Sequence, residues 1–475
     1  MRRGWLLALA ILPTLAGCDL APPYAVPASV TPTAAYREVG PWTPAAPADA
    51  SARGRWWTVV EDADLDHLED RVEQSSPRLA AALARYEQAS ALAGRARANL
   101  YPTLSAGLDV GRSFYPGIAN HDLVLGAAAG YEVDLWGRVR NQVGAARLEA
   151  EASAADTASI RLSLQAELAD DYLSLRGLDA RIDVLRQTDE AYTAALKLTQ
   201  RRFDGGASSE IDVGRAKTQL ADVEAQYEQA GASRALLEHA IGILVGESPS
   251  TFTLPAQSAL IDPPHVPIAA PSALLERRPD VAAAERRVAE ANARIGVARA
   301  AYYPSVTLNA AGGLETLGSV GAASAGYWAL GPLAISLPVF DGGRRKANLA
   351  LSRAAFDEVA ADYRQTVLDA FRQVEDELAL ANRLARAEAK QQDAVSAAVE
   401  TDRLANRRYM EGAADYLEVV TAQTAELQAR QTDIQIRTQR LMASVDLVRA
   451  LGGGWTPAGG GVAMARPVEQ PITAQ

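Results

Sequence analysis

The feature that most constrains this chain is a proline-free run of about 64 residues, from about Val139 to Arg202. Apolar side chains recur through it at spacings of three, four and seven, as at Leu168, Tyr172, Leu175 and Ile182. A continuous helix of this length would be ~95 Å long, too long to be buried within a compact domain. The run therefore predicts a helix that packs along other helices in a coiled coil. Gly205 and Gly206 would end it, and a return helix is expected from about Ile211 to Val245.

The same arrangement occurs a second time, with a period near 206 residues. Arg202–Ala207 reads Arg-Phe-Asp-Gly-Gly-Ala, and Arg408–Ala413 reads Arg-Tyr-Met-Glu-Gly-Ala. Because further matches keep this offset over about forty residues, we interpret the pattern as an internal duplication. The second half then predicts a long helix over about Arg344–Met410 and a return helix over about Leu417–Leu451.

Each long helix is preceded by a shorter one. Ala-rich runs with interspersed Glu and Arg predict helices over Arg78–Leu100 and Pro279–Tyr302. Pro102 and Pro304, which lie 202 positions apart, would end them.

After these prolines the hydrophobic period changes from 3.6 to 2, which predicts strands. The alternating runs lie at about 103–110, 122–134, 306–310 and 327–339, and the last contains two prolines and is the least regular. Strands with one apolar and one polar face, and of nearly this length, are typical of transmembrane barrels. The edge of a soluble sandwich is the alternative on the pattern alone.

Four strands are too few to close a barrel, and open strand edges cannot face lipid. Several copies of the chain would have to share their strands, and their long helices would then continue the barrel as a helical cylinder. The number of copies does not follow from this geometry.

The amino terminus predicts a signal peptide. Arg2 and Arg3 precede a short apolar run over Trp5–Leu12, which is too short for a lasting membrane helix. Residues 15–18, Leu-Ala-Gly-Cys, resemble a bacterial lipobox, which implies cleavage before Cys18 and lipidation of that residue. An ordinary signal peptide is the alternative.

These signals predict the domain organisation of the chain. We expect a signal peptide at 1–17, a Pro- and Ala-rich extended tether at 18–55, a first repeat at 56–260, a second repeat at 261–455 and a carboxy-terminal tail at 456–475.

Composition argues against several functions. The formal net charge of -11 and the sequence pI near 5.1 argue against nucleic-acid binding. The four histidines are scattered, and no metal motif, nucleophile elbow or phosphate-binding glycine loop occurs. We therefore expect no enzyme activity, no cofactor and no metal.

Four short stretches of the chain are the most specific: Cys18–Tyr24, Asp134–Arg138, Leu274–Asp280 and Val339–Arg344. They resemble the outer-membrane factors of tripartite efflux systems, which are TolC- and OprM-like proteins, and most of all the NodT-type lipoproteins. The resemblance covers nearly the whole mature chain. It implies an α+β membrane protein, in which a homotrimer forms a twelve-stranded barrel from four strands per chain, continued by a long periplasmic helical barrel.

The resemblance also implies a function and partners. Small molecules would pass passively through an outer-membrane exit duct, supplied by a periplasmic adaptor protein and an inner-membrane pump of the proton-driven resistance class. The rival interpretations are a duct for type I protein secretion, a periplasmic coiled-coil scaffold without a pore, and a lipid-anchored cell-wall enzyme.

The family pattern places two functions at the ends of the helix hairpins. Adaptor docking would fall on the two turns, at Gly205, Gly206, Ser209, Asp212, Gly412, Ala413 and Asp415, and plain hairpin turns are the alternative. A constriction would form from Asp415, Leu417, Glu418 and Thr421. Leu417 matches the family's leucine, whereas Thr421 departs from its acidic residue. Asp415 and Glu418 are therefore expected to supply a ring of negative charge.

Two tryptophans, Trp136 and Trp328, lie near the ends of predicted strands. Both are candidates for an aromatic girdle at the membrane interface. Packing at the junction between strand and helix is an equal alternative for Trp136.

Overall fold

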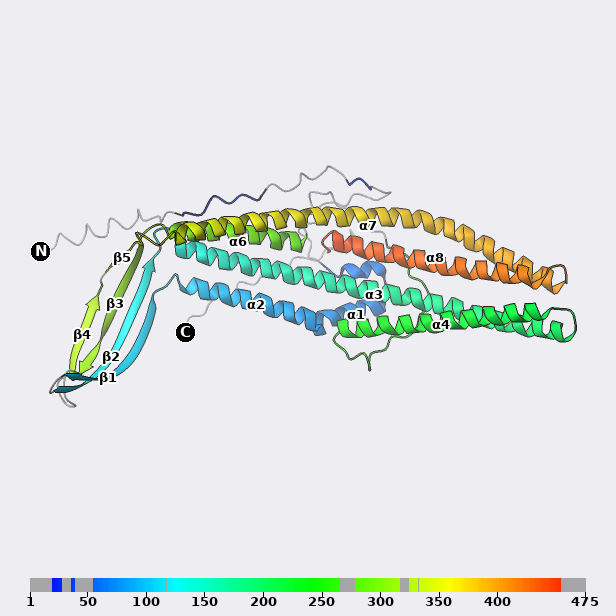
Figure 1. Cartoon of the computed structure of the whole chain (residues 1–475), viewed down its shortest axis with the longest axis horizontal. Helices are drawn as coiled ribbons and strands as arrows, with labels where there is room; N and C mark the ends of the chain where they lie inside the picture. Colours follow the sequence, from blue (N-terminus) through cyan, green and yellow to red (C-terminus); the bar gives the residue numbers. More distant parts are fainter. Residues whose placement is uncertain are drawn as a thin grey trace. The chain divides into compact units, whose positions relative to one another are not determined.

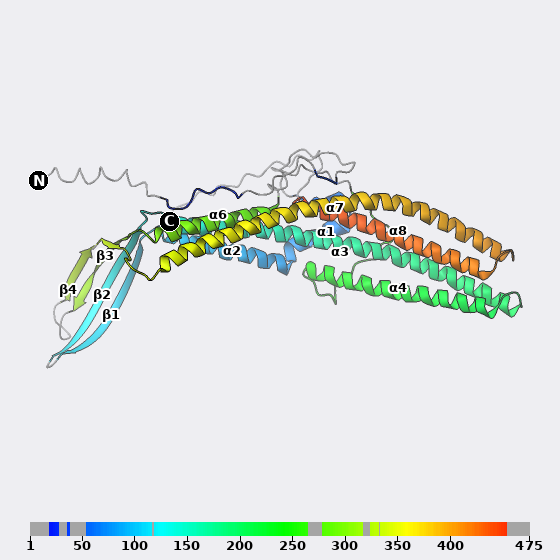
Figure 2. The same cartoon turned by 45° about the horizontal axis from the view of Figure 1, so that its top comes forward.

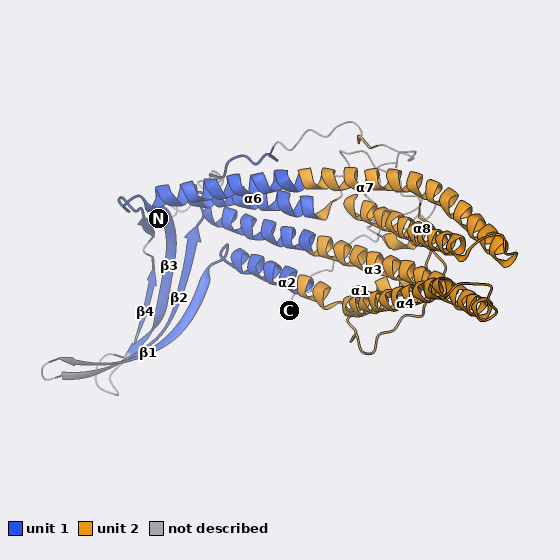
Figure 3. Cartoon of the chain, turned by 45° about the vertical axis from the view of Figure 1, so that its right-hand side comes forward, with its two compact units in different colours: residues 1–30, 83–156, 280–367 blue, residues 31–82, 157–279, 368–475 orange. Residues whose placement is uncertain are grey.

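The computed structural model describes residues 19–27, 36–38, 54–115, 118–264, 278–316, 324–331 and 333–453. The chain divides into two compact units, coloured separately in Figure 3. Unit 1 comprises Met1–Val30, Leu83–Asp156 and Asp280–Val367, and unit 2 comprises Thr31–Ala82, Thr157–Pro279 and Leu368–Gln475. Each unit therefore combines segments from both halves of the chain.

From α2 in the first half and from α6 in the second, both halves follow the order helix, strands, long helix, return helix (Figure 1). The first half contains η2 (Trp56–Val60), α1 (Ala63–Ser75), α2 (Pro77–Ala98), β1 (Thr103–Tyr115), β2 (Ile118–Val133), α3 (Arg138–Asp204) and α4 (Glu210–Leu244). The second half contains α6 (Pro279–Ala300), β3 (Ser305–Thr316), β4 (Ser324–Leu330), β5 (Ala334–Ser336), α7 (Arg344–Met410) and α8 (Tyr416–Ala450).

The predicted helices are confirmed. The helices α3 and α7 each run for 67 residues without interruption, and α4 and α8 return alongside them for 35 residues each. The sequence did not predict η2 or α1. None of the helices in the described ranges carries an apolar stretch long enough to cross a membrane.

The strand prediction is confirmed for three strands and wrong for the fourth. The run expected over 327–339 is broken, because β4 ends at Leu330 and β5 covers only Ala334–Ser336. Gly331 between them has a φ of 97°, a left-handed conformation that leaves the extended path. Pro338 has no N–H to donate to a strand ladder, so the run cannot continue as a regular strand.

The strands form one antiparallel sheet in the order β1-β2-β3-β4, with β5 also pairing with β3. Its register preserves the duplication. In the first half Thr103 pairs with Gly130, and in the second half Ser305 pairs with Ser336. These partners lie 202 and 206 positions later, the two offsets found in the sequence. The internal repeat is therefore present in the hydrogen-bonded structure.

One row of large apolar side chains on the sheet is exposed within the single chain. Leu104 is 78% exposed, Val110 is 77% exposed and Leu330 is 85% exposed. Exposed apolar area of this extent normally marks a surface that meets lipid or another protein.

In unit 1 residues 19–22 lie along α3 and α6. The Asp19 carboxylate accepts hydrogen bonds from Asn141 Nδ2 at 2.8 Å and from the Ala21 amide at 2.9 Å. Asn292 Nδ2 donates to the Pro22 carbonyl at 2.9 Å. Although partial burial opposes ionisation, the hydrogen bond from Asn141 holds the pKa of Asp19 below its ordinary value.

In unit 2 a buried arginine fixes the segment that follows α4. Arg176 on α3 is 2% exposed, pairs with Asp179 at 3.1 Å and donates to the Pro255 carbonyl at 2.7 Å. Arg234 on α4 also pairs with Asp179, at 2.6 Å, and the Gln257 amide donates to the same carboxylate. Since the charges of Arg176 and Asp179 are buried and paired with each other, removing either would leave the other uncompensated.

Candidate functional site

The first hairpin turn, between α3 and α4, is closed by backbone bonds and a side-chain cap. Gly206 has a φ of 74°, which glycine adopts without strain at a helix end. Ser209 caps α4, because its side chain accepts from the Asp212 amide while the Asp212 carboxylate accepts from the Ser209 amide. Burial opposes ionisation of Asp212, but the hydrogen bonds from Ser209 and Ser208 hold its pKa below the ordinary value.

The second hairpin turn, between α7 and α8, is built in the same way. Gly412 has a φ of 77°, and the Ala413 amide donates to the Arg408 carbonyl at 2.8 Å. Asp415 caps α8 by accepting from the Glu418 amide at 3.1 Å. The predicted site residues Gly412, Ala413 and Asp415 therefore have a local structural role in shaping this turn.

The two turns are tied to each other by a residue that the sequence did not single out. Arg202 near the end of α3 donates to the Tyr409 carbonyl at 2.8 Å and to the Met410 carbonyl at 3.1 Å. Its guanidinium also lies 4.4 Å from the centre of the Tyr409 ring. The ring of Tyr409 in turn packs against the ring of Tyr416, with the two ring centroids 5.4 Å apart. The Tyr409 carbonyl also accepts from the Gly412 amide at 3.1 Å, whereas the Met410 carbonyl at the end of α7 receives its donor from Arg202 on the other hairpin.

A signal for this contact was present in the sequence. Arg202 and Tyr409 both belong to the two matching six-residue stretches, but a match between repeats does not show which side chain crosses to the other hairpin. The equivalent Arg408 instead pairs with Glu418 of its own hairpin at 3.0 Å.

The predicted constriction residues lie together on the first turns of α8. Leu417 is 45% exposed, and Thr421 donates its hydroxyl to the Leu417 carbonyl at 2.8 Å. The carboxylate of Asp415 is engaged as a cap and that of Glu418 as an ion pair with Arg408, so neither is free in the single chain. The pair is about half exposed on both sides and is therefore readily broken.

Of the two tryptophans, Trp136 lies at the junction between strand and helix. Its Nε1 donates to the Pro304 carbonyl at 2.8 Å, and its ring stacks on Tyr303 with centroids 4.7 Å apart. This geometry agrees with the junction alternative for Trp136. Trp328 on β4 is 83% exposed.

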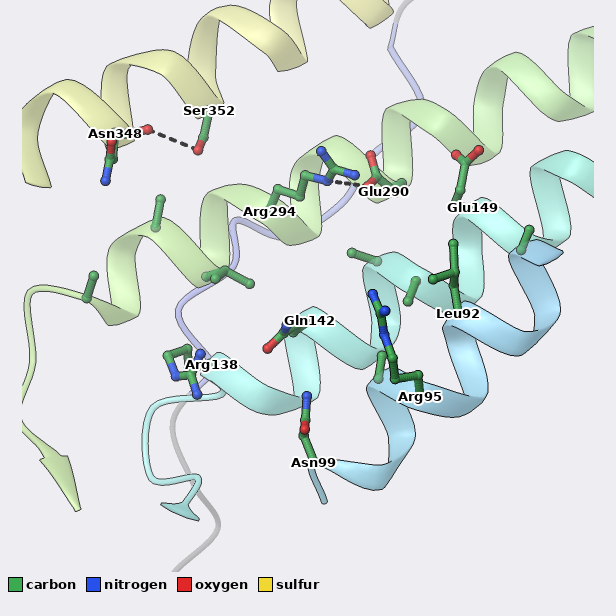
Figure 4. Close-up of a pocket in the computed structure, with 17 residues that line it drawn as sticks. Leu92, Arg95, Asn99, Arg138, Gln142, Glu149, Glu290, Arg294, Asn348 and Ser352 are labelled. Carbon is green, nitrogen blue, oxygen red and sulfur yellow. Dashed lines mark hydrogen bonds and ion pairs between the residues drawn. The ribbon is translucent and has the colours of Figure 1, made fainter. Parts of the chain in front are cut away.

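Unit 1 also contains a groove of about 810 Å³ between α2, α3, α6 and α7 (Figure 4). Alanine is its commonest lining residue, at six of seventeen positions, and charged side chains stand at Arg95, Arg138, Glu149, Glu290 and Arg294. Arg294 pairs with Glu290 one helical turn away. The lining contains no histidine and no cysteine.

Cys18 lies outside the described residues, so its lipidation stays a prediction. Within the described ranges no group of histidine, cysteine, aspartate or glutamate side chains is arranged to hold a metal ion.

A duplicated chain with an amphipathic antiparallel sheet and two pairs of long helices has the architecture of an outer-membrane channel protein. Comparison with known sequences agrees with this class. The family model described as "Outer membrane efflux protein" matches residues 68–247 and 270–453, once in each half. The chain belongs to this family of efflux ducts, and it is an outer-membrane protein.

Individual relatives match over almost the entire length. Outer membrane protein OprJ of Pseudomonas aeruginosa is 33% identical over 467 residues, covering 94% of this chain and 95% of that protein. The toluene efflux pump outer membrane protein TtgC of Pseudomonas putida is 33% identical over 482 residues, covering 98% and 99%. The solved outer-membrane channel OprN superposes with a TM-score of 0.82 at 30% identity, covering 92% of this chain and 100% of that one.

Proposed function

We propose that this protein is the lipid-anchored exit duct of a tripartite efflux pump, assembled as a homotrimer. Its strands would form a barrel of twelve, and its long helices a periplasmic helical barrel. Small molecules would pass through it passively, supplied by a periplasmic adaptor and an inner-membrane pump of the proton-driven resistance class. The proposal is supported above all by the sheet, whose apolar row is exposed in the single chain and whose outer strands leave their edges unpaired within the described residues.

The hairpin ends are the natural adaptor-binding surface in this proposal. Their two glycine turns have the same backbone bonding, and exposed apolar side chains surround them: Ile211 is 66% exposed and Met410 is 62% exposed. A helix end that only meets water does not require exposed apolar side chains, whereas a surface that binds another protein uses them. The proposed docking residues are Gly205, Gly206, Ser209 and Asp212 at the first turn, and Gly412, Ala413 and Asp415 at the second.

The proposed constriction lies beside this surface. Three copies of Leu417 would meet near the axis, with Asp415 and Glu418 around them. Because Glu418 is paired with Arg408, the negative ring would form only where that ion pair opens. Single-channel conductance of an Asp415→Ala, Glu418→Ala double variant tests this idea, and a conductance and cation preference equal to those of the unaltered protein would exclude it.

The function itself is tested in cells that lack the chain. We expect such cells to accumulate small toxic compounds and a fluorescent efflux substrate, and re-expression of the chain to restore export. Cross-linking in intact cells should then recover an adaptor together with a proton-driven pump. Unchanged accumulation with loss of a secreted protein, and recovery of an ATP-driven exporter instead, would favour the type I secretion duct.

A further inference from the structure

The two repeats contact each other through two sets of residues. Because the chain is duplicated, each set has a counterpart at an outer edge of the sheet. Where the two repeats meet inside the chain, the end of β2 lies beside the start of β3, and Val133 pairs with Val306. Just beyond, Trp136 stacks on Tyr303 and donates to the Pro304 carbonyl. The junction between the repeats is thus made by a residue following one hairpin and the turn preceding the next.

The turn that precedes the first hairpin has the same residues but lacks this cover. Tyr101 and Pro102 lie 202 positions before Tyr303 and Pro304. Tyr101 is 59% exposed, and none of the aromatic contacts in the described part of the chain involves it. Leu104, the counterpart of Val306, is 78% exposed.

The segment that follows the second hairpin is the counterpart of the residues around Trp136. Val339, 206 positions after Val133, is 91% exposed, and Phe340 is 90% exposed. Four residues separate Val339 from α7, as four separate Val133 from α3. The aromatic residue stands at the first of these four positions rather than the third, so the contact would use a different ring placement.

These two uncovered surfaces cannot meet within one chain. The strands β2 and β3 lie between β1 and the edge that β4 and β5 form, so the edges are three strand spacings apart, or ~14 Å (Figure 2 shows β1 to β4). Both edges also retain unpaired backbone N–H and C=O groups among the described strands, which favour pairing with another chain. A second copy of this chain would offer each edge the opposite edge and its exposed apolar side chains.

We propose that Val339 and Phe340 of one copy pack against Tyr101, Pro102 and Leu104 of the next copy, repeating between chains the junction that Trp136 makes inside the chain. This inference rests on the proposed oligomeric duct and names the contact that closes it. Applied to the interface, the two repeat offsets would place Val339 of one copy opposite Leu104 of its neighbour, as Val133 lies opposite Val306. Because Val339 follows Pro338 and lies beyond β5, this contact would rest on side-chain packing rather than on a continued strand ladder.

Disulfide cross-linking of the full-length, membrane-extracted protein tests this register. Side chains opposite each other in an antiparallel pair have Cβ atoms about 4.5–5.5 Å apart, close enough for a disulfide after small adjustments. Oxidation of a Leu104→Cys, Val339→Cys double variant should give products of two and more chains on a denaturing gel without reductant. The two single variants, which also retain Cys18, give the background.

Two further pairs serve as matched controls. A Val133→Cys, Val306→Cys variant repeats the contact within the chain and should cross-link without any increase in mass. A Leu108→Cys, Val339→Cys variant moves one partner four residues along β1, or ~13 Å, and should give about tenfold less product.

The outcomes separate the contact from the proposed function. If native mass shows several chains but the Leu104–Val339 pair cross-links no better than the displaced pair, the contact is wrong and the duct stands. If native mass shows a single chain, both are wrong. The contact is supported if the Leu104–Val339 pair gives cross-linked chains and the displaced Leu108–Val339 pair does not.

Discussion

Replacing Arg202 with alanine should loosen the end of the second hairpin without unfolding the chain. Arg202 supplies the carbonyls of Tyr409 and Met410 with donors from the other hairpin. Alanine keeps a high helix propensity, so α3 itself should persist. The Met410 carbonyl would then depend on water and the Tyr409 carbonyl would keep only its bond from the Gly412 amide, so the turn around Gly412 would open more often.

The size of the effect follows from the interactions that the Arg202 guanidinium makes. A hydrogen bond from a charged donor contributes about 1.5–3 kcal/mol when shielded, and a cation over an aromatic ring about 0.5–1 kcal/mol at an exposed site. Arg202 is only half-buried, so we expect a loss of about 2 kcal/mol for the two bonds and the ring contact together. This corresponds to a roughly 30-fold rise in the population of the open turn.

Hydrogen exchange followed by mass spectrometry measures that population directly. Amides of residues 404–420 should exchange about 30-fold faster in Arg202→Ala than in the unaltered protein. The matched control is Arg201→Ala, since Arg201 is exposed and makes no ion pair or side-chain hydrogen bond within the described residues. Equal exchange in both variants would refute the view that Arg202 holds the hairpins together.

Three further predictions concern stability in detergent. Glu69 is fully buried without a hydrogen-bond partner, and burial raises its pKa well above the ordinary value of 4.5. The folded state therefore keeps Glu69 protonated at pH values where the unfolded state ionises it, so the free energy of unfolding falls as the pH rises above 4.5. The Glu69→Gln variant should have a higher melting temperature than the unaltered protein at about pH 8, but not at about pH 5. Arg176→Met should lower the free energy of unfolding by about 3 kcal/mol in denaturant titration and expose residues 254–257 to protease, whereas an unchanged midpoint would contradict the buried network. Gly412→Ala should lower the free energy of unfolding by about 1 kcal/mol, because of its left-handed φ alone. Gly246→Ala should lower it clearly more, because the added Cβ would lie 2.4 Å from the Ser75 carbonyl oxygen. Equal melting temperatures of the two variants would show that this clash is relieved.

Much of the fold followed from periodicity and punctuation. The long helices were predictable because proline is absent from them and glycine follows each one, and both restrictions act locally on the backbone. The sheet register was implicit in the two repeat offsets. The break between β4 and β5 was missed because a left-handed Gly331 leaves no mark in an apolar pattern.

The candidate site was predicted in position but not in detail. The turns at Gly206 and Gly412 were recognisable, since tight reversals between helices favour glycine. The caps of Ser209 and Asp415 belong to local patterns that capping rules describe. The contact of Arg202 with Tyr409 joins residues 207 positions apart, and no local rule specifies it.

The duct account depends most directly on the number of copies and on a central opening. Native mass spectrometry of the lipidated, detergent-purified protein, combined with end-on electron microscopy of the same sample, measures both. The account predicts three chains around a central hole. A monomer or dimer without a hole would contradict it and would favour a periplasmic coiled-coil scaffold without a pore.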